Sequence, residues 1–233
     1  MSATPTDIVF MPGFDGVGEL RREFVEALAG IAPACAIDYP NRTLETLAGY
    51  ARFASSQVSP QSRPVLVAES FSGLVATRWA AQDPHVAAIV LCGAFASNPV
   101  AWSGFASSMP ATAHFLGANL VNPMTYFSGD PARRRWSAAL KTAMRSLHKD
   151  VVAERLRIIA TSDVRAELGS LRIPVVLVQF EEDLVIDPAS RAALEAACFE
   201  PRVVKVAGPH YAIEIRPRES VAALRPHLAA LFP

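Results

Sequence analysis

The stretch that most constrains the fold is residues 64–73, Pro-Val-Leu-Val-Ala-Glu-Ser-Phe-Ser-Gly, where a short apolar run ends at a serine. The run is too short for a helix and rich in β-branched residues, so it predicts a buried strand. Apolar residues recur at helical spacing from Leu74 onward. A sharp turn at Ser70 would press strand and helix together, and the small residues Ala68 and Ser72 fit that crowding. The sequence therefore predicts strand, sharp turn and helix, with Ser70 on the turn.

The rest of the chain repeats this alternation of strand and helix. Buried-strand patterns are expected at residues 7–11, 34–39, 86–92, 173–180 and 202–206, and helical stripes lie between most of them, for example at residues 20–28 and 44–58. Strands that alternate with helices are joined by right-handed crossovers into a mainly parallel sheet with helices on both faces. We therefore predict an α/β fold, and the 233 residues suit one domain that carries an insertion.

The alternation stops after Gly93. Residues 95–169 contain no buried-strand run and are rich in aromatic side chains. Asp130 and Pro131 predict the start of a helix, and a second helix is expected from residue 150 to about 159. This predicts a core of residues 1–94 and 170–233 with a helical insertion at 95–169. Aromatic stripes at helical spacing also fit simple packing against the core, so both interpretations stay open.

Composition limits the classes of partner. Acidic and basic residues balance at 22 each, which gives no indication of nucleic acid or an anionic membrane surface. Three scattered cysteines lack the short spacings that hold zinc and favour unpaired thiols in a reducing compartment. We find neither a secretory-signal pattern nor an apolar run of membrane-spanning length. The expectation is a soluble cytoplasmic protein without a metal.

A glycine turn at residues 12–18 follows the first predicted strand and raises a rival interpretation. Strand, glycine turn and helix also describe a dinucleotide site, and Asp38 ends the next strand where a ribose-binding acid could lie. The glycines at 13, 16 and 18 run G-x-x-G-x-G, whereas the dinucleotide fingerprint is G-x-G-x-x-G. The turn fits better as a loop that presents backbone N–H groups to a developing negative charge.

Three side chains suit nucleophilic catalysis. A serine hydroxyl needs a base to take its proton, and a histidine oriented by a carboxylate does this. Ser70, Asp183 and His210 each follow a predicted strand, in that order along the chain. Several acids cluster near residue 183, and Asp187 is the second candidate for the orienting acid.

These motifs resemble those of the serine α/β-hydrolases. Residues 68–72 are a relaxed form of that family's G-x-S-x-G motif, and the acid and histidine follow in the family's order. The resemblance implies an acyl-enzyme on Ser70, an oxyanion hole from the N–H groups of Phe14 and Phe71, and no cofactor. It also implies that residues 95–169 form a cap (lid) whose aromatic side chains line the substrate pocket: Trp102, Phe105, Phe115, Tyr126 and Phe127.

The leading hypothesis is an esterase for small to medium, largely apolar carboxylic esters. The same three residues would serve a thioesterase or acyltransferase, and the fold could also host a cofactor-free peroxidase, a lyase or a non-catalytic binding protein. Dehalogenase chemistry is disfavoured because those relatives carry aspartate where Ser70 stands. The expected partner is a small ester or thioester, and the sequence gives no prediction of oligomeric state.

Overall fold

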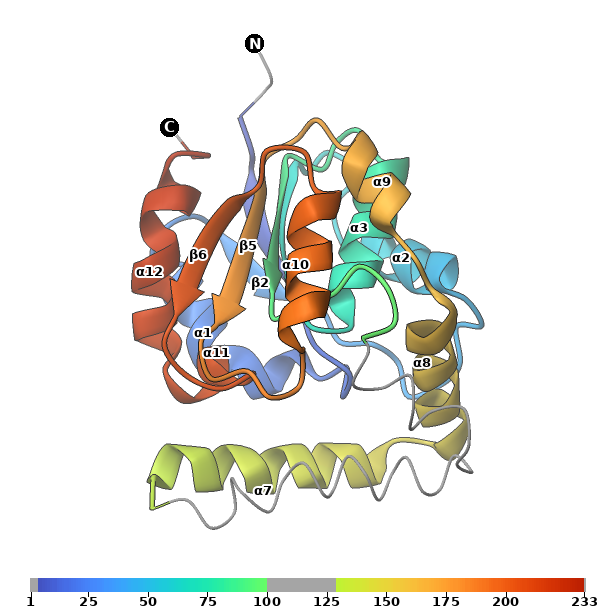
Figure 1. Cartoon of the computed structure of the whole chain (residues 1–233), viewed down its shortest axis with the longest axis vertical. Helices are drawn as coiled ribbons and strands as arrows, with labels where there is room; N and C mark the ends of the chain where they lie inside the picture. The colour runs from blue at the N-terminus through green and yellow to red at the C-terminus, as the bar shows by residue number, and fades with distance from the viewer. Residues whose placement is uncertain (1–3, 100–128, 233) are drawn as a thin grey trace.

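The computed structural model of the chain describes residues 4–99 and 129–232, which contain a six-stranded sheet in the order β2-β1-β3-β4-β5-β6 (Figure 1). Every neighbouring pair of strands is parallel. The strands are β1 (Asp7–Met11), β2 (Ala34–Ala36), β3 (Pro64–Glu69), β4 (Ala88–Cys92), β5 (Val175–Phe180) and β6 (Arg202–Val206). The predicted α/β fold with a parallel sheet is confirmed.

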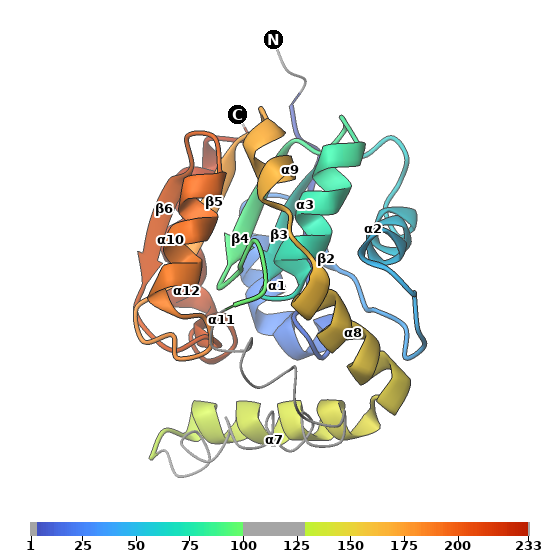
Figure 2. The ribbon, with the colours of Figure 1, turned by 45° about the vertical axis from the view of Figure 1, so that its right-hand side comes forward.

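Helices cover both faces of this sheet. One face carries the 3₁₀ turn η1 (Gly18–Arg21) with α1 (Arg22–Leu28), α11 (Ala212–Ile215) and α12 (Pro217–Ala229). The other carries α2 (Leu47–Ser56), α3 (Ser72–Gln82), α9 (Arg165–Ser170) and α10 (Pro188–Ala197). Figures 1 and 2 show the two helical layers with the sheet between them.

The central strands are buried on both faces because successive side chains point to opposite sides of a sheet. In β3, Val65 and Val67 pack into the layer of α1 and α12. Leu66 and Ala68 pack into the layer of α2 and α3. A strand of this kind must be apolar throughout, which explains the continuous run in the sequence.

Helix α7 (Pro131–Ser146) lies across the edge of the core where the carboxyl ends of the strands meet (Figures 1 and 2). Asp130 accepts a hydrogen bond from Ala132 N at its start, as expected of a helix cap. Arg133 forms an ion pair with Glu182 at 3.4 Å, and Asn41 donates to the Ser146 carbonyl at 2.8 Å. Both ends of α7 are thereby connected to loops of the sheet edge.

Helix α8 (Lys149–Thr161) runs from α7 back to the core, and both helices predicted for this region are present. Ser97 forms an isolated antiparallel bridge with Asp163, so the chain on either side of the inserted region meets there. Helix α9 lies within the predicted insertion but packs against α3 and α10. The division at residues 95 and 169 stays a prediction.

The element boundaries differ from the prediction in a few places. Strand β2 ends at Ala36 because Asp38 and Tyr39 turn toward the glycine turn: Gly18 N donates to Asp38 Oδ1 and Tyr39 N to the Gly16 carbonyl. The short helices α9 and α11 were not predicted, since elements of four to six residues carry little periodicity. Among the described helices, we find none with the length and apolar character needed to cross a membrane.

Candidate active site

Ser70 occupies the predicted turn between β3 and α3. Its φ is +50°, a left-handed conformation that costs a residue with a Cβ roughly 1–2 kcal/mol. Two backbone hydrogen bonds of 2.9 Å hold it, from Ser70 N to the Cys92 carbonyl and from Gly73 N to the Ser70 carbonyl. Ala68 and Ser72 are fully buried, in keeping with the predicted crowding. The turn leaves Ser70 partly exposed at the carboxyl edge of the sheet.

Ser70, His210 and Asp183 form a continuous hydrogen-bonded chain. His210 Nε2 lies 3.0 Å from Ser70 Oγ, and His210 Nδ1 lies 2.9 Å from Asp183 Oδ2. The three residues come from the loops after β3, β5 and β6. Asp187 instead caps α10, where it accepts from Ser190 N at 2.9 Å, so the geometry favours Asp183 as the acid beside the histidine.

The environment of Asp183 keeps its carboxyl ionised. Burial by itself would raise the pKa of Asp183, but the hydrogen bond with His210 and those from Ile186 N and Val185 N bring the pKa below its ordinary value. An ionised Asp183 accepts a hydrogen bond from His210 Nδ1–H, which leaves Nε2 able to accept the proton of the Ser70 hydroxyl. This is the tautomer that a general base next to a serine needs.

The histidine is also enclosed by packing. A Cβ at Gly93 would lie 3.1 Å from the His210 ring and 2.9 Å from Phe180, and the φ of Gly93 is +54°. The Phe180 ring meets the His210 ring edge-on with centroids 6.3 Å apart. Any side chain at position 93 would therefore displace the imidazole.

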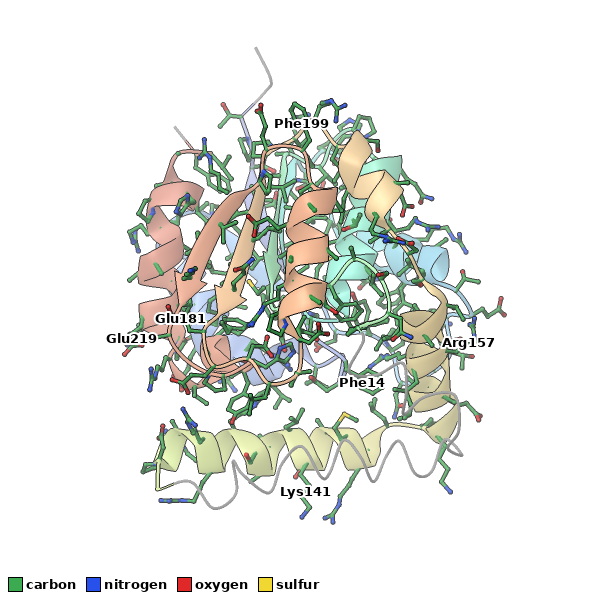
Figure 3. The ribbon with its side chains drawn as sticks, viewed as in Figure 1. Phe14, Lys141, Arg157, Glu181, Phe199 and Glu219 are labelled. Carbon is green, nitrogen blue, oxygen red and sulfur yellow. The ribbon has the colours of Figure 1, made fainter. Side chains whose placement is uncertain are left out.

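The two residues predicted to supply oxyanion donors contact each other through their side chains. The Phe14 and Phe71 rings pack edge-on with centroids 6.5 Å apart, and Phe71 directly follows Ser70. Figure 3 shows Phe14 at the side of the core that faces α7. Within the described ranges, neither backbone N–H donates to an acceptor.

Two buried arginines that the sequence analysis did not single out contact the glycine turn. Arg21 contacts three carboxylates, one of which belongs to Asp15 in that turn. Arg155, on α8, donates from Nη1 to the Phe14 carbonyl at 2.5 Å and from Nε to the Tyr50 hydroxyl at 3.1 Å. One signal was readable in the sequence: an acidic residue, Glu69, ends an otherwise apolar buried strand.

The five aromatic residues predicted to line the pocket, Trp102, Phe105, Phe115, Tyr126 and Phe127, lie outside the described residues. Two of the other histidines lie apart from the Ser70 chain. His85 is exposed and bonds Asp83, and His148 precedes α8, where its backbone N–H donates to Asn41.

The chain belongs to the α/β hydrolase family, whose pattern it matches over residues 8–224. None of the curated proteins matches the sequence. Among solved structures, it is similar to the enol-lactonase from Burkholderia xenovorans LB400, with 17% identity, a TM-score of 0.74 and coverage of 98% of this chain and 92% of that one. A lipase-esterase related protein from Clostridium acetobutylicum ATCC 824 has 14% identity and a TM-score of 0.79 (96% and 94% covered). A bromoperoxidase from Bacillus anthracis has 14% identity and a TM-score of 0.72 (98% and 92% covered). At these identities the likeness extends to the fold alone.

Proposed function

We propose that the protein hydrolyses carboxylic esters of small to medium, largely apolar substrates through an acyl-enzyme on Ser70. The observation that carries this proposal is the continuous chain from Ser70 Oγ through His210 to the buried Asp183, with distances of 3.0 and 2.9 Å. Distances of this size are within hydrogen-bond reach for proton transfer in both steps. The proposal is further supported by the general pattern of α/β-hydrolases, in which residues of these types follow strands at the carboxyl edge of the sheet.

In the first half of the reaction, Ser70 Oγ attacks the ester carbonyl carbon while its proton passes to His210 Nε2. The carbonyl oxygen gains negative charge, which the N–H groups of Phe14 and Phe71 would stabilise. The tetrahedral intermediate then breaks its bond to the alcohol oxygen, and His210 gives the proton to that oxygen. Asp183 stabilises the imidazolium between these two transfers.

In the second half, water replaces the alcohol. His210 takes a proton from the water as the water oxygen attacks the acyl carbon, and it returns the proton to Ser70 Oγ as the carboxylic acid leaves. A thioester would follow the same route with a thiol as the leaving group, and an acceptor alcohol in place of water would give acyl transfer.

Labelling with a fluorophosphonate, followed by intact-mass analysis and peptide mapping, tests the activated serine. We expect one adduct, on Ser70, in the wild-type protein and in Ser56→Ala, a control at an exposed serine of α2. Ser70→Ala should take up no label and should lose on the order of a thousandfold or more in kcat on an ester substrate. A folded wild-type protein that takes up no label would contradict the proposal.

Parallel series of esters and thioesters of increasing acyl length then define the reaction. We expect higher kcat/KM for esters than for thioesters of the same acyl group. The reverse order would favour a thioesterase, and label uptake without turnover of either series would favour an acyltransferase or another chemistry on the same three residues.

A further inference from the structure

Arg21 joins three segments that carry the proposed catalytic groups. Its Nη1 lies 2.7 Å from Asp15 in the glycine turn, and its Nε lies 2.7 Å from Glu69, the residue before Ser70. Its Nη2 lies 2.8 Å from the other Glu69 oxygen and 3.2 Å from Glu214, four residues beyond His210. We call Arg21, Asp15, Glu69 and Glu214 the Arg21 cluster.

The cluster is buried and connected further. The side chain of Arg21 is 1% exposed and that of Glu214 is fully buried. Gly13 N donates to Glu69 Oε2 at 3.3 Å, which adds a direct bond between the glycine turn and the end of β3. The ring of Trp136 on α7 lies 4.7 Å from the Arg21 guanidinium carbon. The guanidinium therefore has partners on the glycine turn, at the end of β3 beside Ser70 and on the segment that follows His210.

We propose, resting on the function above, that Arg21 is a positioning residue that holds the glycine turn, the Ser70 turn and the His210 loop in their mutual geometry. It touches no reacting atom, and it acts through Asp15, Glu69 and Glu214. Reacting groups must be held to within fractions of an ångström for efficient transfer. One planar guanidinium that contacts three carboxyl groups connects three segments of the site at once.

The charges within the cluster do not balance, and a proton on one carboxyl reduces the excess of negative charge. One guanidinium faces three carboxylates, which would leave a buried net charge of −2 if all were ionised. The thiol of Cys92 is a further titratable group that lies close to Glu69 and Glu214. A hollow between η1, α1 and α11 is lined by Arg21 and Glu214 of the cluster and by four further charged residues: Glu19, Arg22, Glu23 and Glu26.

We infer that Glu214 is the carboxyl that holds the proton. Neither of its oxygens makes a hydrogen bond with good geometry to a described residue. Burial and the charge of Glu69 raise the pKa of Glu214 well above its ordinary value, even though Arg21 acts in the opposite direction. The same burial would lower the pKa of Arg21, but its three acidic partners raise it, so the guanidinium stays charged.

The proton on Glu214 gives a test that does not depend on activity. A carboxyl whose pKa is raised by folding gives stability that is present below its ordinary pKa of about 4.5 and is lost as the pH rises toward and through the raised value. Glu214→Gln mimics the neutral form at every pH. The melting temperature of Glu214→Gln minus that of the wild type should rise by on the order of 3 °C or more from pH 5 to pH 8.5. Glu23→Gln, at an exposed position of the same hollow, should show no such trend. A constant difference between Glu214→Gln and wild type across this range would overturn the neutral Glu214.

The positioning role is tested by Asp15→Asn, which removes one ion pair and brings the cluster closer to neutrality. Asparagine keeps an oxygen that can accept the existing bond from Val17 N at 2.9 Å, so the variant should be at least as stable as wild type. We expect kcat nonetheless to fall by about 10- to 100-fold with KM changed less than twofold. Unchanged kcat in the folded variant would overturn the proposal, because a purely structural role predicts no loss.

Arg21→Lys supplies the complementary variant, since lysine keeps the charge but lacks the planar guanidinium, two nitrogens of which face the Glu69 carboxylate. We expect the same fall in kcat, against unchanged kinetics in Arg22→Lys. If Ser70 of the wild type took up no fluorophosphonate, the proposed function would be contradicted. The pH dependence of the melting temperature of Glu214→Gln would still test the proton assigned to Glu214. If the wild type were labelled on Ser70 and active, and Asp15→Asn were fully active as well, only the positioning role of Arg21 would be contradicted.

Discussion

Arg21 and Arg155 contact the same glycine turn from two regions of the molecule, and their surroundings are opposite in kind. Arg21 lies in η1 of the core and is surrounded by three carboxylates. Arg155 lies in α8 of the inserted region, is fully buried, and donates to neutral oxygens, the Phe14 carbonyl and the Tyr50 hydroxyl. One side of the turn is held by ion pairs and the other by uncharged acceptors.

The charge of Arg155 is compensated indirectly. Its guanidinium carbon lies 5.5 and 5.6 Å from the ring centroids of Tyr39 and Tyr50, whose faces attract a cation. Tyr50 also donates its hydroxyl to Glu154 at 3.1 Å, and Glu154 in turn accepts from two backbone N–H groups of the loop before α2. A buried guanidinium is therefore stabilised in two ways in this molecule. Arg21 has several carboxyl groups beside it, whereas Arg155 has aromatic ring faces and a tyrosine hydroxyl that connects it to Glu154.

The comparison predicts that loss of Arg21 is the more damaging of the two. Arg21→Met should lower the free energy of unfolding by about 3–5 kcal/mol, because it leaves buried carboxylates without their counter-charge. Arg22→Met is the matched control: its side chain is 66% exposed and pairs with the exposed Glu19, so a loss of less than about 1 kcal/mol is expected. Chemical denaturation measures both. If Arg21→Met lost no more free energy of unfolding than Arg22→Met, the ion pairs of Arg21 would not stabilise the fold and the contrast with Arg155 would be wrong.

Arg155→Met should cost less, about 1–3 kcal/mol, since it leaves neutral acceptors unsatisfied rather than charges. The control is Arg157→Met on the same helix, an exposed side chain that bonds the Glu45 carbonyl, with an expected change within about 0.5 kcal/mol. Both free energies come from the same denaturant titrations. If Arg155→Met proved as costly as Arg21→Met, the charge of Arg155 would need a direct ionic partner, contrary to the interpretation above.

Sequence reasoning found the parts of the site that depend on local pattern and chain order. The turn at Ser70 follows from small residues around an apolar run, and His210 follows the last strand, so both could be placed before the fold was known. Sequence reasoning placed Asp183 ahead of Asp187 as the orienting acid but left both in play, because both are acids in one loop. The choice depends on which carboxylate faces His210 and which one caps α10.

The two arginines lay beyond sequence reasoning because their partners are distant along the chain. Arg21 and Glu69 are 48 residues apart, and Arg155 and Phe14 are 141 apart. An arginine on an amphipathic helix is normally taken as solvated, and helical periodicity does not reveal that a guanidinium is buried. The parallel sheet brings these residues together, since it places the ends of β1 and β3 side by side.

The smallest of the three effects concerns the backbone between the two arginines. Gly16 has a φ of +77°, and a Cβ there would lie 2.7 Å from Arg155 Nη1. Gly16→Ala should therefore cost about 1–2 kcal/mol from the left-handed backbone, plus whatever the displacement of Arg155 adds. Gly129→Ala, where an added Cβ meets nothing within 4 Å, serves as the control with little change. In the Arg155→Met background the cost of Gly16→Ala should shrink, and a double-mutant cycle would measure this as a coupling of at least about 0.5 kcal/mol. If the free-energy losses of the two single variants simply added in the double variant, the cost of Gly16→Ala would come from the backbone alone. Arg155 would then adjust to the methyl group without weakening its bond to Phe14.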